Sequence, residues 1–456
     1  MFEPKIHTTK ELGDNSYLWG SGSEGFLVDP QRDVSRFLSD AEASNIKIKY
    51  VFETHLHNDY LTGALEIREK TGAEIIVSEQ ANVKFPHKPL KNGDEIQIGG
   101  LKVIAFETPG HTPEHLSYLV CKDKETDPCA IFTGGSLLVE SAGRTDLLGL
   151  EWTEPLTRKQ FQTLQKLTRF PGPTQLLPTH GTGSFCSASS GSRNLITTIE
   201  KELKSNPALA APDEEAFLKI HLSNLLSYPT YYQYMGEINR KGPKILGGIP
   251  KIKPLAPEQA AHEIEKGEWV IDARNRFDFA NSHIPGAVNI ELGTLFGSYV
   301  GWIIPFYAPF LLILPEPEED SMIQAMTQLI RIGYESSVGY LFGGLNAWKS
   351  SGYPIKQYPL STLDEVRELI KKKKTSQILD VRQKVEWDSG HLEGSSHIMI
   401  GELSSRVHEL QGKGEIWTIC AGGYRAALAA SILDRAGIPV RAAVQGGVPD
   451  ILAAGL

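Results

Sequence analysis

The chain has little cysteine, no long hydrophobic run and no excess of positive charge. Four cysteines in 456 residues, at irregular spacing, do not make a disulfide framework, so a reducing compartment is expected. A formal net charge of −9 argues against a nucleic-acid partner. The first residues contain no apolar core of signal-peptide length and carry acidic side chains early. These features predict a cytoplasmic protein.

One apolar stretch, Tyr299 to Leu314, carries no charge, so its length must be compared with that of a membrane-spanning helix. It is shorter than the roughly 20 residues that a helix needs to cross a bilayer. Pro305 and Pro309 also interrupt it, and proline breaks a helix interior. We therefore predict a loop that leads into a buried strand, and no membrane partner. The composition, 41% hydrophobic and 22% charged, is that of a globular protein.

The segment THLHNDYLTG, residues 54 to 63, carries the first chemical signal. It follows the apolar run Tyr50 to Phe52 and precedes an amphipathic run, so it should form a strand-to-helix loop. Alternate side chains of an extended loop point the same way, and His55, His57 and Asp59 can therefore converge on one cation. An isolated pair of histidines more often satisfies backbone groups or caps a helix. The segment alone does not decide between these interpretations.

Two further histidines stand at the ends of predicted strands. His111 follows the alternating stretch Leu101 to Phe106, and His180 follows Leu176 and Leu177. Metal sites are commonly built on loops that a rigid sheet holds in place. Three strand ends that each deliver histidine to a Gly/Pro-rich loop therefore predict a metal site. The candidate ligands are His55, His57, Asp59, His111 and His180.

The motifs THxHxD, PGHTP, FTG, GRTDLL and PTHG together resemble the metallo-β-lactamase fold. They look most like the branch that contains persulfide dioxygenases and glyoxalase-II-type thioesterases. The resemblance implies an αββα sandwich over residues 1–245, an α/β fold with helices packed outside two sheets. In the resembling dioxygenases two histidines and an aspartate hold one iron ion, and His55 and His111 match those histidines.

Two positions depart from the family pattern. Gly135 stands where the family has the ligand aspartate, and Tyr60 stands where many relatives have a fourth histidine. His57 could complete a three-histidine site, Asp59 could supply an oxygen ligand, or the metal could be lost. Both changes disfavour a dinuclear zinc site. We expect one metal ion per chain, iron (Fe²⁺) or zinc.

Two more residues accompany the metal motifs. Arg144 in GRTDLL matches a position that is usually structural in the family, and we predict a structural role here. Cys186 follows His180 on a Gly/Ser-rich loop that should face the cleft. It could bind a thiol substrate or carry a persulfide. The alternative is a small buried apolar residue.

A Gly/Pro/Lys-rich segment, residues 241 to 257, is typical of a linker. Beyond it, the stretch WVIDARNRFDFANSHIPGAVNI (269–290) corresponds to QILDVRQKVEWDSGHLEGSSHI (377–398). Two copies of one α/β unit are therefore predicted, at residues 255–357 and 360–456. The copies resemble rhodanese domains.

Only the second copy has a cysteine at the position of the rhodanese nucleophile. The strand Ile416 to Ile419 runs into Cys420-Ala-Gly-Gly-Tyr-Arg425, which a helix follows. Backbone N–H groups and the positive end of the helix dipole favour a thiolate there and would cradle a persulfide. Leu314 stands near that position in the first copy, which therefore cannot transfer sulfur this way. The predicted site comprises catalytic Cys420 and Arg425, with Gly422, Gly423 and Tyr424 binding the substrate.

The two resemblances together imply oxidation of a low-molecular-weight thiol persulfide to sulfite, with Cys420 carrying sulfane sulfur. The alternative is a zinc-dependent thioester hydrolase of the glyoxalase II type fused to a sulfurtransferase. A third hypothesis makes the first domain a scaffold and leaves only Cys420 active. Both enzyme hypotheses take a small-molecule thiol or persulfide as partner, and we expect a homo-oligomer.

Overall fold

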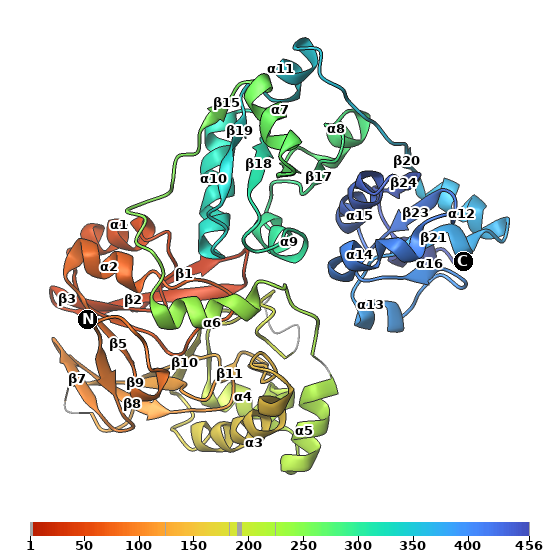
Figure 1. Cartoon of the computed structure of the whole chain (residues 1–456). Helices are drawn as coiled ribbons and strands as arrows, with labels where there is room; N and C mark the ends of the chain where they lie inside the picture. Colours follow the sequence, from red (N-terminus) through yellow and green to blue (C-terminus); the bar gives the residue numbers. More distant parts are fainter. Residues whose placement is uncertain (1–2, 124, 182, 189–193, 224, 456) are drawn as a thin grey trace. The chain divides into compact units, whose positions relative to one another are not determined.

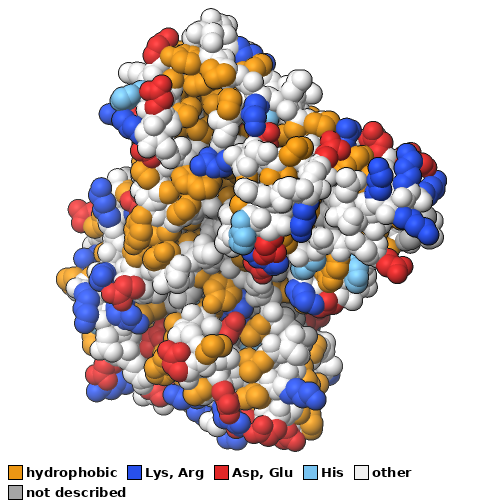
Figure 2. Space-filling model, turned by 45° about the vertical axis from the view of Figure 1, so that its right-hand side comes forward, with side chains coloured by type: hydrophobic (Ala, Val, Ile, Leu, Met, Phe, Trp, Pro, Cys, Tyr) orange, Lys and Arg blue, Asp and Glu red, His pale blue; other side chains and the backbone are white. Residues whose placement is uncertain are grey.

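The computed structural model describes residues 3–455 except residues 124, 182, 189–193 and 224 (Figure 1). The chain divides into two compact units. The N-terminal unit comprises Met1–Ile249 and Ile330–Gly333, and the C-terminal unit comprises Pro250–Leu329 and Tyr334–Leu456. Charged side chains of both signs lie among hydrophobic ones on the face that Figure 2 displays.

Two six-stranded sheets form the N-terminal unit. The first follows the chain order, with β1 (Lys5–Thr9), β2 (Asp14–Ser21), β3 (Glu24–Val28), β4 (Lys47–Phe52), β5 (Glu74–Ser78) and β6 (Lys88–Leu90). The second has the order β14 (Thr197–Thr198), β13 (Gln175–Pro178), β10 (Ala130–Gly134), β9 (Leu116–Lys122), β8 (Leu101–Glu107) and β7 (Glu95–Ile98). A short hairpin pairs β11 (Leu137–Leu138) with β12 (Ser141–Ala142).

Three hydrophobic clusters hold these layers together. One lies between the sheets and joins Phe26 of the first sheet to Phe132 of the second. Another packs Phe37 of a helix on the outer face of the first sheet, and a third packs Leu164 on the second sheet. The helices are α1 (Ser35–Ala43), α2 (Ala64–Thr71), α3 (Leu150–Leu167), α4 (Ile199–Ser205), α5 (Glu214–Ser223) and α6 (Tyr232–Lys241) (Figure 1). The predicted αββα sandwich is confirmed.

Strand β8 shows how the sequence pattern produces the central layer. Its alternate residues Leu101, Val103 and Ala105 are buried, and the residues between them are only half-buried. Side chains on a strand alternate between its faces, so this pattern directs one face to the core. The Phe132 ring lies at the centre of the layer, 5.1 Å from the Tyr17 ring.

Two five-stranded sheets with the same strand order form the C-terminal unit. The first has the order β15 (Pro254–Leu255), β19 (Ser337–Leu341), β18 (Phe310–Ile313), β16 (Trp269–Asp272) and β17 (Val288–Asn289). The second has β20 (Leu360–Ser361), β24 (Val440–Ala443), β23 (Ile416–Ile419), β21 (Ile378–Asp380) and β22 (Ser396–His397). The predicted duplication of one α/β unit is confirmed.

Helices flank both of these sheets. In the first copy they are α7 (Pro257–Glu265), α8 (Arg276–Asn281), α9 (Phe296–Ile303), α10 (Glu318–Arg331) and α11 (Gly344–Ser350). In the second copy they are α12 (Leu363–Lys371), α13 (Lys384–Asp388), α14 (Ile400–Arg406), α15 (Tyr424–Arg435) and α16 (Val448–Ala453). The repeated element order places equivalent loops at the ends of β18 and β23.

Strand register places Leu314 at the position of Cys420. Ile313 pairs with Asp272 in the first copy, and Ile419 pairs with Asp380 in the second. The next residue along the chain leaves the strand and precedes a helix in each copy. The first copy therefore has an aliphatic side chain where the second has its thiol.

The uncharged stretch from Tyr299 to Leu314 forms two elements. Residues 304–309 form no helix or strand and lead into the buried strand β18, as predicted. The loop prediction was wrong for Tyr299 to Ile303, which belong to the buried helix α9. A helix that is apolar on all sides packs inside a core, and α9 ends just before Pro305. Within the described residues, no helix has the length and hydrophobicity needed to cross a membrane.

Replacing Phe132 by alanine should destabilise the N-terminal unit by about 3–5 kcal/mol, because the fully buried ring would leave a cavity between the sheets. Calorimetric unfolding measures the effect. Trp152→Ala is the control, since Trp152 is 44% exposed and should matter little. Equal transition temperatures for the two variants would contradict this account of the core.

Candidate metal centre

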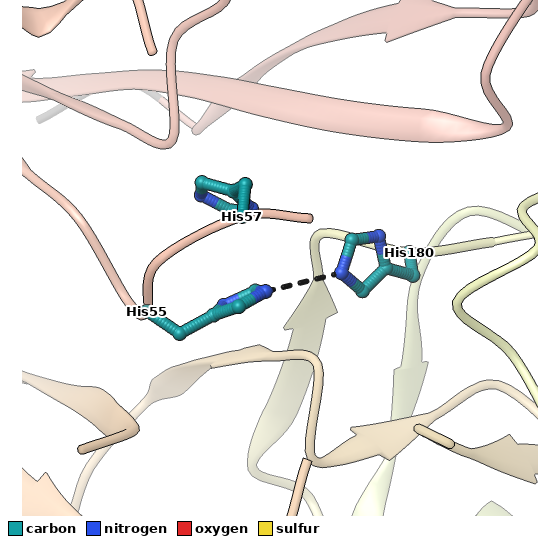
Figure 3. Close-up of side chains that lie close together, drawn as sticks. All are labelled: His55, His57 and His180. Carbon is teal, nitrogen blue, oxygen red and sulfur yellow. Dashed lines mark hydrogen bonds between the residues drawn. The ribbon is translucent and has the colours of Figure 1, made fainter. Parts of the chain in front are cut away.

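Three strand ends of the N-terminal unit bring histidines to one place. His55 and His57 lie on the loop after β4, His111 follows β8, and His180 follows β13. The His55 and His111 ring centroids are 4.8 Å apart, and each lies 5.3 Å from that of His180. All four histidines are buried. Figure 3 shows His55 and His180 directed at each other, with His57 beside them.

Hydrogen bonds determine which nitrogen of each ring carries the lone pair. The Thr54 hydroxyl donates to Asp29 at 2.7 Å, so its oxygen accepts from His55 Nδ1 at 2.8 Å. His111 Nδ1 donates to the Arg144 carbonyl at 2.6 Å. A neutral ring protonated at Nδ1 keeps its lone pair on Nε2. Burial, followed by the neighbouring histidines, holds the pKa of His55 and of His111 well below 6.5, so both rings are neutral.

The third ring is oriented in the same way. His180 Nδ1 lies 2.8 Å from the Asp14 carboxylate, which leaves the lone pair on Nε2. His180 Nε2 lies 3.3 Å from His55 Nε2, so two lone pairs face each other without a proton to share (Figure 3). Two nitrogens bound at about 2.0–2.1 Å to a tetrahedral metal ion lie about 3.3–3.4 Å apart. The spacing fits a cation between the two rings.

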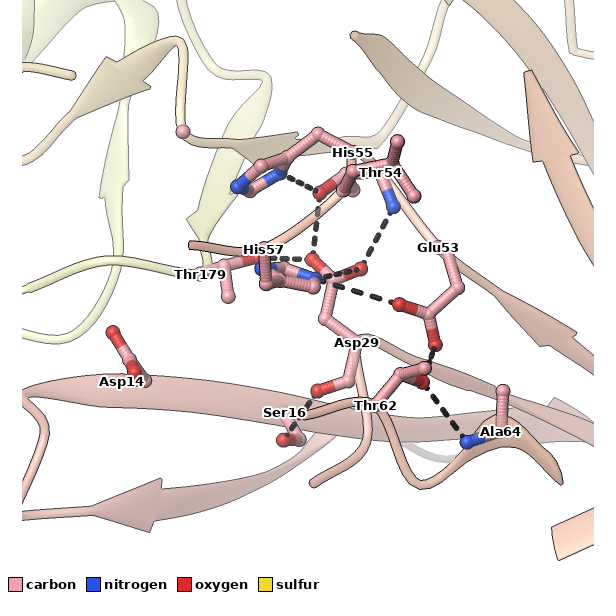
Figure 4. Close-up of polar contacts among 12 residues, drawn as sticks. Asp14, Ser16, Asp29, Glu53, Thr54, His55, His57, Thr62, Ala64 and Thr179 are labelled. Atoms are coloured by element: carbon pink, nitrogen blue, oxygen red, sulfur yellow. Dashed lines mark hydrogen bonds and ion pairs between the residues drawn. The ribbon is translucent and has the colours of Figure 1, made fainter. Parts of the chain in front are cut away.

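His57 is held from its Nε2 side. That nitrogen lies 3.0 Å from the Tyr60 hydroxyl. It also lies 3.3 Å from Asp29 and 3.5 Å from Glu53 (Figure 4). Burial alone would lower the pKa of His57, but the two carboxylates outweigh it and raise the pKa to about 10. Among the described residues, the buried Nδ1 has no hydrogen-bond partner. Since an unpaired buried group costs about 1–3 kcal/mol, Nδ1 is the atom at which His57 would meet a ligand, and a metal ion bound there would have to displace the Nδ1 proton.

Two carboxylates border His180. Ligand atoms of Asp14, Asp59 and His180 lie within 4.8 Å of one another. Both Asp59 oxygens and one Asp14 oxygen are buried, and the described part of the chain gives them no hydrogen-bond partner. Burial, followed by the negative charge of Asp14, raises the pKa of Asp59 to about 7. Unpaired buried oxygens beside a histidine add to the donor set that a divalent cation would use.

The donor atoms fit a transition metal ion. One compact group contains His55, His57 and His180, and another contains His111, His180 and Cys186, with ligand atoms in each group within 4.8 Å. Imidazole and thiol donors suit both iron and zinc. His57 Nδ1 and His111 Nε2 are buried and have no hydrogen-bond partner among the described residues. The groups that share His180 together contain all five predicted ligands.

The two departures from the family pattern each position a histidine. An ideal Cβ at Gly135 would lie 2.2 Å from His111 Cδ2, so the imidazole ring already fills the space of a side chain there. Tyr60 donates to the Asp29 carbonyl at 3.2 Å and contacts His57. Neither residue offers a ligand.

Arg144 has the structural surroundings that the sequence predicted. Its guanidinium is buried, bonds both Asp146 oxygens at 2.7 and 2.8 Å, and donates to the Phe185 carbonyl at 2.8 Å. Cys186 is also fully buried, so it does not present an open thiol, but ligand-type side chains surround it. Burial, followed by the charge of Asp59, raises the pKa of the Cys186 thiol well above 9.

The predicted thiol site of the C-terminal unit lies at the end of β23. The Gly423 N–H donates to Cys420 Sγ at 3.1 Å, as an amide cradle requires. Gly423 has φ +92°, and a Cβ there would lie 2.1 Å from the Val444 carbonyl oxygen, so the position requires glycine. Gly422 is exposed, and a Cβ on it would meet no atom within 4 Å. The loop around Cys420 is therefore open to solvent at Gly422.

The side chains of Arg425 and Tyr424 point elsewhere than the prediction assumed. Arg425 donates to both carboxylate oxygens of Glu386, at 2.5 and 2.8 Å. Because this ion pair occupies the guanidinium, Arg425 acts on Cys420 through its positive charge. The Tyr424 hydroxyl donates to the Glu291 carbonyl at 3.0 Å in the first copy. Its backbone, rather than its ring, belongs to the loop around the thiol.

Sequence reasoning missed three buried carboxylates of the metal centre. Asp29 follows β3 and Glu53 follows β4, so the strand-end rule that singled out the histidines could have found both. Asp14 begins β2 and pairs with His180 across the sandwich. No local signal marks Asp14.

The chain matches two family models. Residues 10–198 match the metallo-β-lactamase superfamily, and residues 256–351 and 362–454 match the rhodanese-like domain. A structure described as metallo-beta-lactamase from Staphylococcus aureus is 25% identical, with a TM-score of 0.66, and the match covers 74% of this chain and 98% of that one. The chain therefore consists of a metallo-β-lactamase superfamily domain followed by two rhodanese-like domains. It belongs to the metallo-β-lactamase–rhodanese fusion proteins.

Two curated relatives each match less than half of this chain. Hydroxyacylglutathione hydrolase from Brucella anthropi is 32% identical over 36% of this chain, and the chain spans 63% of that relative. Persulfide dioxygenase ETHE1 from Bos taurus is 27% identical over 48% of this chain and 78% of the relative. The fold is thus that of a superfamily of metalloenzymes with more than one reaction.

Gly135→Ala should lower metal affinity by about 10–100-fold, because the added methyl group would push against His111. Competition with a chelator measures the dissociation constant. Gly181→Ala is the matched control beside His180, since its Cβ would meet only ordinary contacts at 3.4 and 3.6 Å. Equal metal affinities of Gly135→Ala and Gly181→Ala would show that the space at position 135 does not affect metal binding.

Proposed function

We propose that the N-terminal unit oxidises a low-molecular-weight thiol persulfide to sulfite, and that Cys420 passes sulfane sulfur to this product. In the first reaction RSSH, dioxygen and water give RSH, sulfite and two protons. The S–S bond breaks, the terminal sulfur is oxidised and dioxygen is reduced. In the second reaction sulfite attacks the outer sulfur of the Cys420 persulfide. Thiosulfate forms, and the Cys420 thiolate leaves.

The facing Nε2 atoms of His55 and His180, 3.3 Å apart, carry this proposal. They support one metal position within a histidine cluster, together with His57 Nδ1 and His111 Nε2. When bound there, iron would supply the one-electron chemistry that reactions of dioxygen require. A cluster of imidazole donors suits such a centre.

The chain's own residues keep this centre ready for a ligand. Thr54, Arg144 and Asp14 each hold one ring through Nδ1, which leaves the Nε2 lone pair of that ring for a ligand. The burial of the rings excludes bulk water, which strengthens electrostatic interactions inside the site. Binding would therefore require little reorganisation of the protein.

The fusion with rhodanese-like domains favours sulfur as the substrate element. A Cys420 thiolate cradled by the Gly423 N–H can accept and release sulfane sulfur. The equivalent position of the first copy is Leu314, so a single sulfur carrier per chain is proposed. Sulfite from the first reaction would be the acceptor in the second.

Zinc-dependent thioester hydrolysis is the second candidate, because a relative named hydroxyacylglutathione hydrolase is 32% identical. Hydrolysis on a dinuclear centre would need the carboxylate and histidine that Gly135 and Tyr60 replace. Tyr60 therefore argues against the dinuclear hydrolase centre, whereas Gly135 removes a ligand from both candidate centres.

His111→Ala should reduce oxygen consumption with glutathione persulfide by more than about 100-fold, because Nε2 of His111 is one of the ligands. An oxygen electrode and metal quantification on the same samples provide the readouts. His87→Ala is the control, since the His87 ring nitrogen bonds the Phe85 carbonyl of its own segment. Thiol release from an acyl-glutathione without oxygen uptake would instead support the hydrolase.

Cys420→Ser should abolish thiosulfate formation from a persulfide and sulfite, because serine cannot carry sulfane sulfur. Sulfite should accumulate in its place. Ion chromatography of both anions measures the change, and Cys129→Ser serves as the thiol control in the other unit. Undiminished thiosulfate from the Cys420→Ser protein would contradict the role of Cys420.

A further inference from the structure

The metal centre lacks an anionic ligand from the loop after β10. Gly135 occupies that position, and a Cβ there would lie 2.2 Å from His111 Cδ2 and 2.8 Å from His111 Nε2. A carboxylate could enter only if His111 moved. Any anion that balances the cation must therefore come from another segment of the chain.

Cys186 lies where such an anion is needed. Its Sγ and the ring nitrogens of His111 and His180 lie within 4.8 Å of one another. The cysteine is fully buried. His111 Nε2 is also buried and has no hydrogen-bond partner among the residues that the structure describes. An unpaired imidazole nitrogen beside a buried thiol and a second imidazole is the donor arrangement of a transition-metal site.

Arg144 holds the histidine and the cysteine in this arrangement. Its carbonyl accepts from His111 Nδ1 at 2.6 Å, and its backbone N–H donates to the Cys186 carbonyl at 2.9 Å. The Cys186 N–H also contacts the Ser184 hydroxyl at 3.2 Å. One residue thus holds both segments through their backbone and ring atoms.

We propose that Cys186 Sγ is a metal ligand, which joins His111 and His180 and replaces the carboxylate that the family places at position 135. The inference rests on the proposed metal centre and deepens it. On binding, a sulfur–metal bond forms, the thiol loses its proton to solvent, and no oxidation occurs. A coordinated thiol is deprotonated by the cation itself, so the thiolate exists only in the loaded protein.

Cobalt(II) reports this ligand directly, because thiolate coordination gives a charge-transfer band in the near ultraviolet that imidazole and carboxylate ligands do not give. The full-length Cys420→Ser protein, which lacks the thiol at the end of β23, is titrated with cobalt. We expect the band at saturation, and its loss in the additional variant Cys186→Ala. Chelator competition should show affinity reduced by more than about tenfold.

Two further variants separate coordination from packing. Cys121→Ala removes another buried cysteine of the same unit and should keep both the band and the affinity. Cys186→Asp supplies a different anion, so it should recover affinity relative to Cys186→Ala without restoring the band. Circular dichroism and the unfolding temperature establish that each variant is folded.

An unchanged band in Cys186→Ala, or a cobalt complex of the parent protein without this band, would overturn the inference. If oxygen uptake with persulfide persisted in that case, the proposed function would stand and only Cys186 would be excluded. Failure of the parent protein to bind cobalt, iron or zinc would remove both the ligand assignment and the metal centre.

Discussion

The buried carboxylate of Asp29 is the interaction on which the metal centre depends. It accepts hydrogen bonds from the Thr54 N–H and hydroxyl, both at 2.7 Å, and from the Thr179 hydroxyl, and it contacts His57 Nε2 at 3.3 Å (Figure 4). An unpaired carboxylate would be expensive to bury. Burial alone would raise the pKa of Asp29, but His57 and these donors outweigh it and keep the carboxylate ionised. One charge therefore ties the ends of β3, β4 and β13 together.

The charge of Asp29 determines which ring nitrogen of His55 and of His57 is left for a ligand. Since Thr54 donates to Asp29, it must accept from His55 Nδ1, which leaves the His55 lone pair on Nε2. Asp29 also occupies the Nε2 side of His57, which leaves Nδ1 for a ligand. Arg144 and Asp14 act similarly on His111 and His180. The polar groups behind the histidines thus determine the metal site as much as the histidines do.

The sequence was informative where a local pattern determines the structure, and uninformative where distant segments meet. Short apolar runs followed by Gly/Pro-rich loops placed His55, His111 and His180 at strand ends, and an internal repeat revealed the duplicated α/β unit. Pairing across the sandwich leaves no such trace, since Asp14 and His180 are separated by 166 residues. Hydrogen bonds to distant segments also determine where a side chain points. Tyr424 faces Glu291 rather than the thiol because its half-buried hydroxyl donates to the Glu291 carbonyl.

The central claim is that a metal ion lies between His55 Nε2 and His180 Nε2. The most direct measurement is a crystal structure with diffraction data collected on both sides of the iron and zinc absorption edges. We predict one anomalous peak per chain within bonding distance of both nitrogens. The absence of a peak, with the two nitrogens still in contact and a proton between them, would contradict the account.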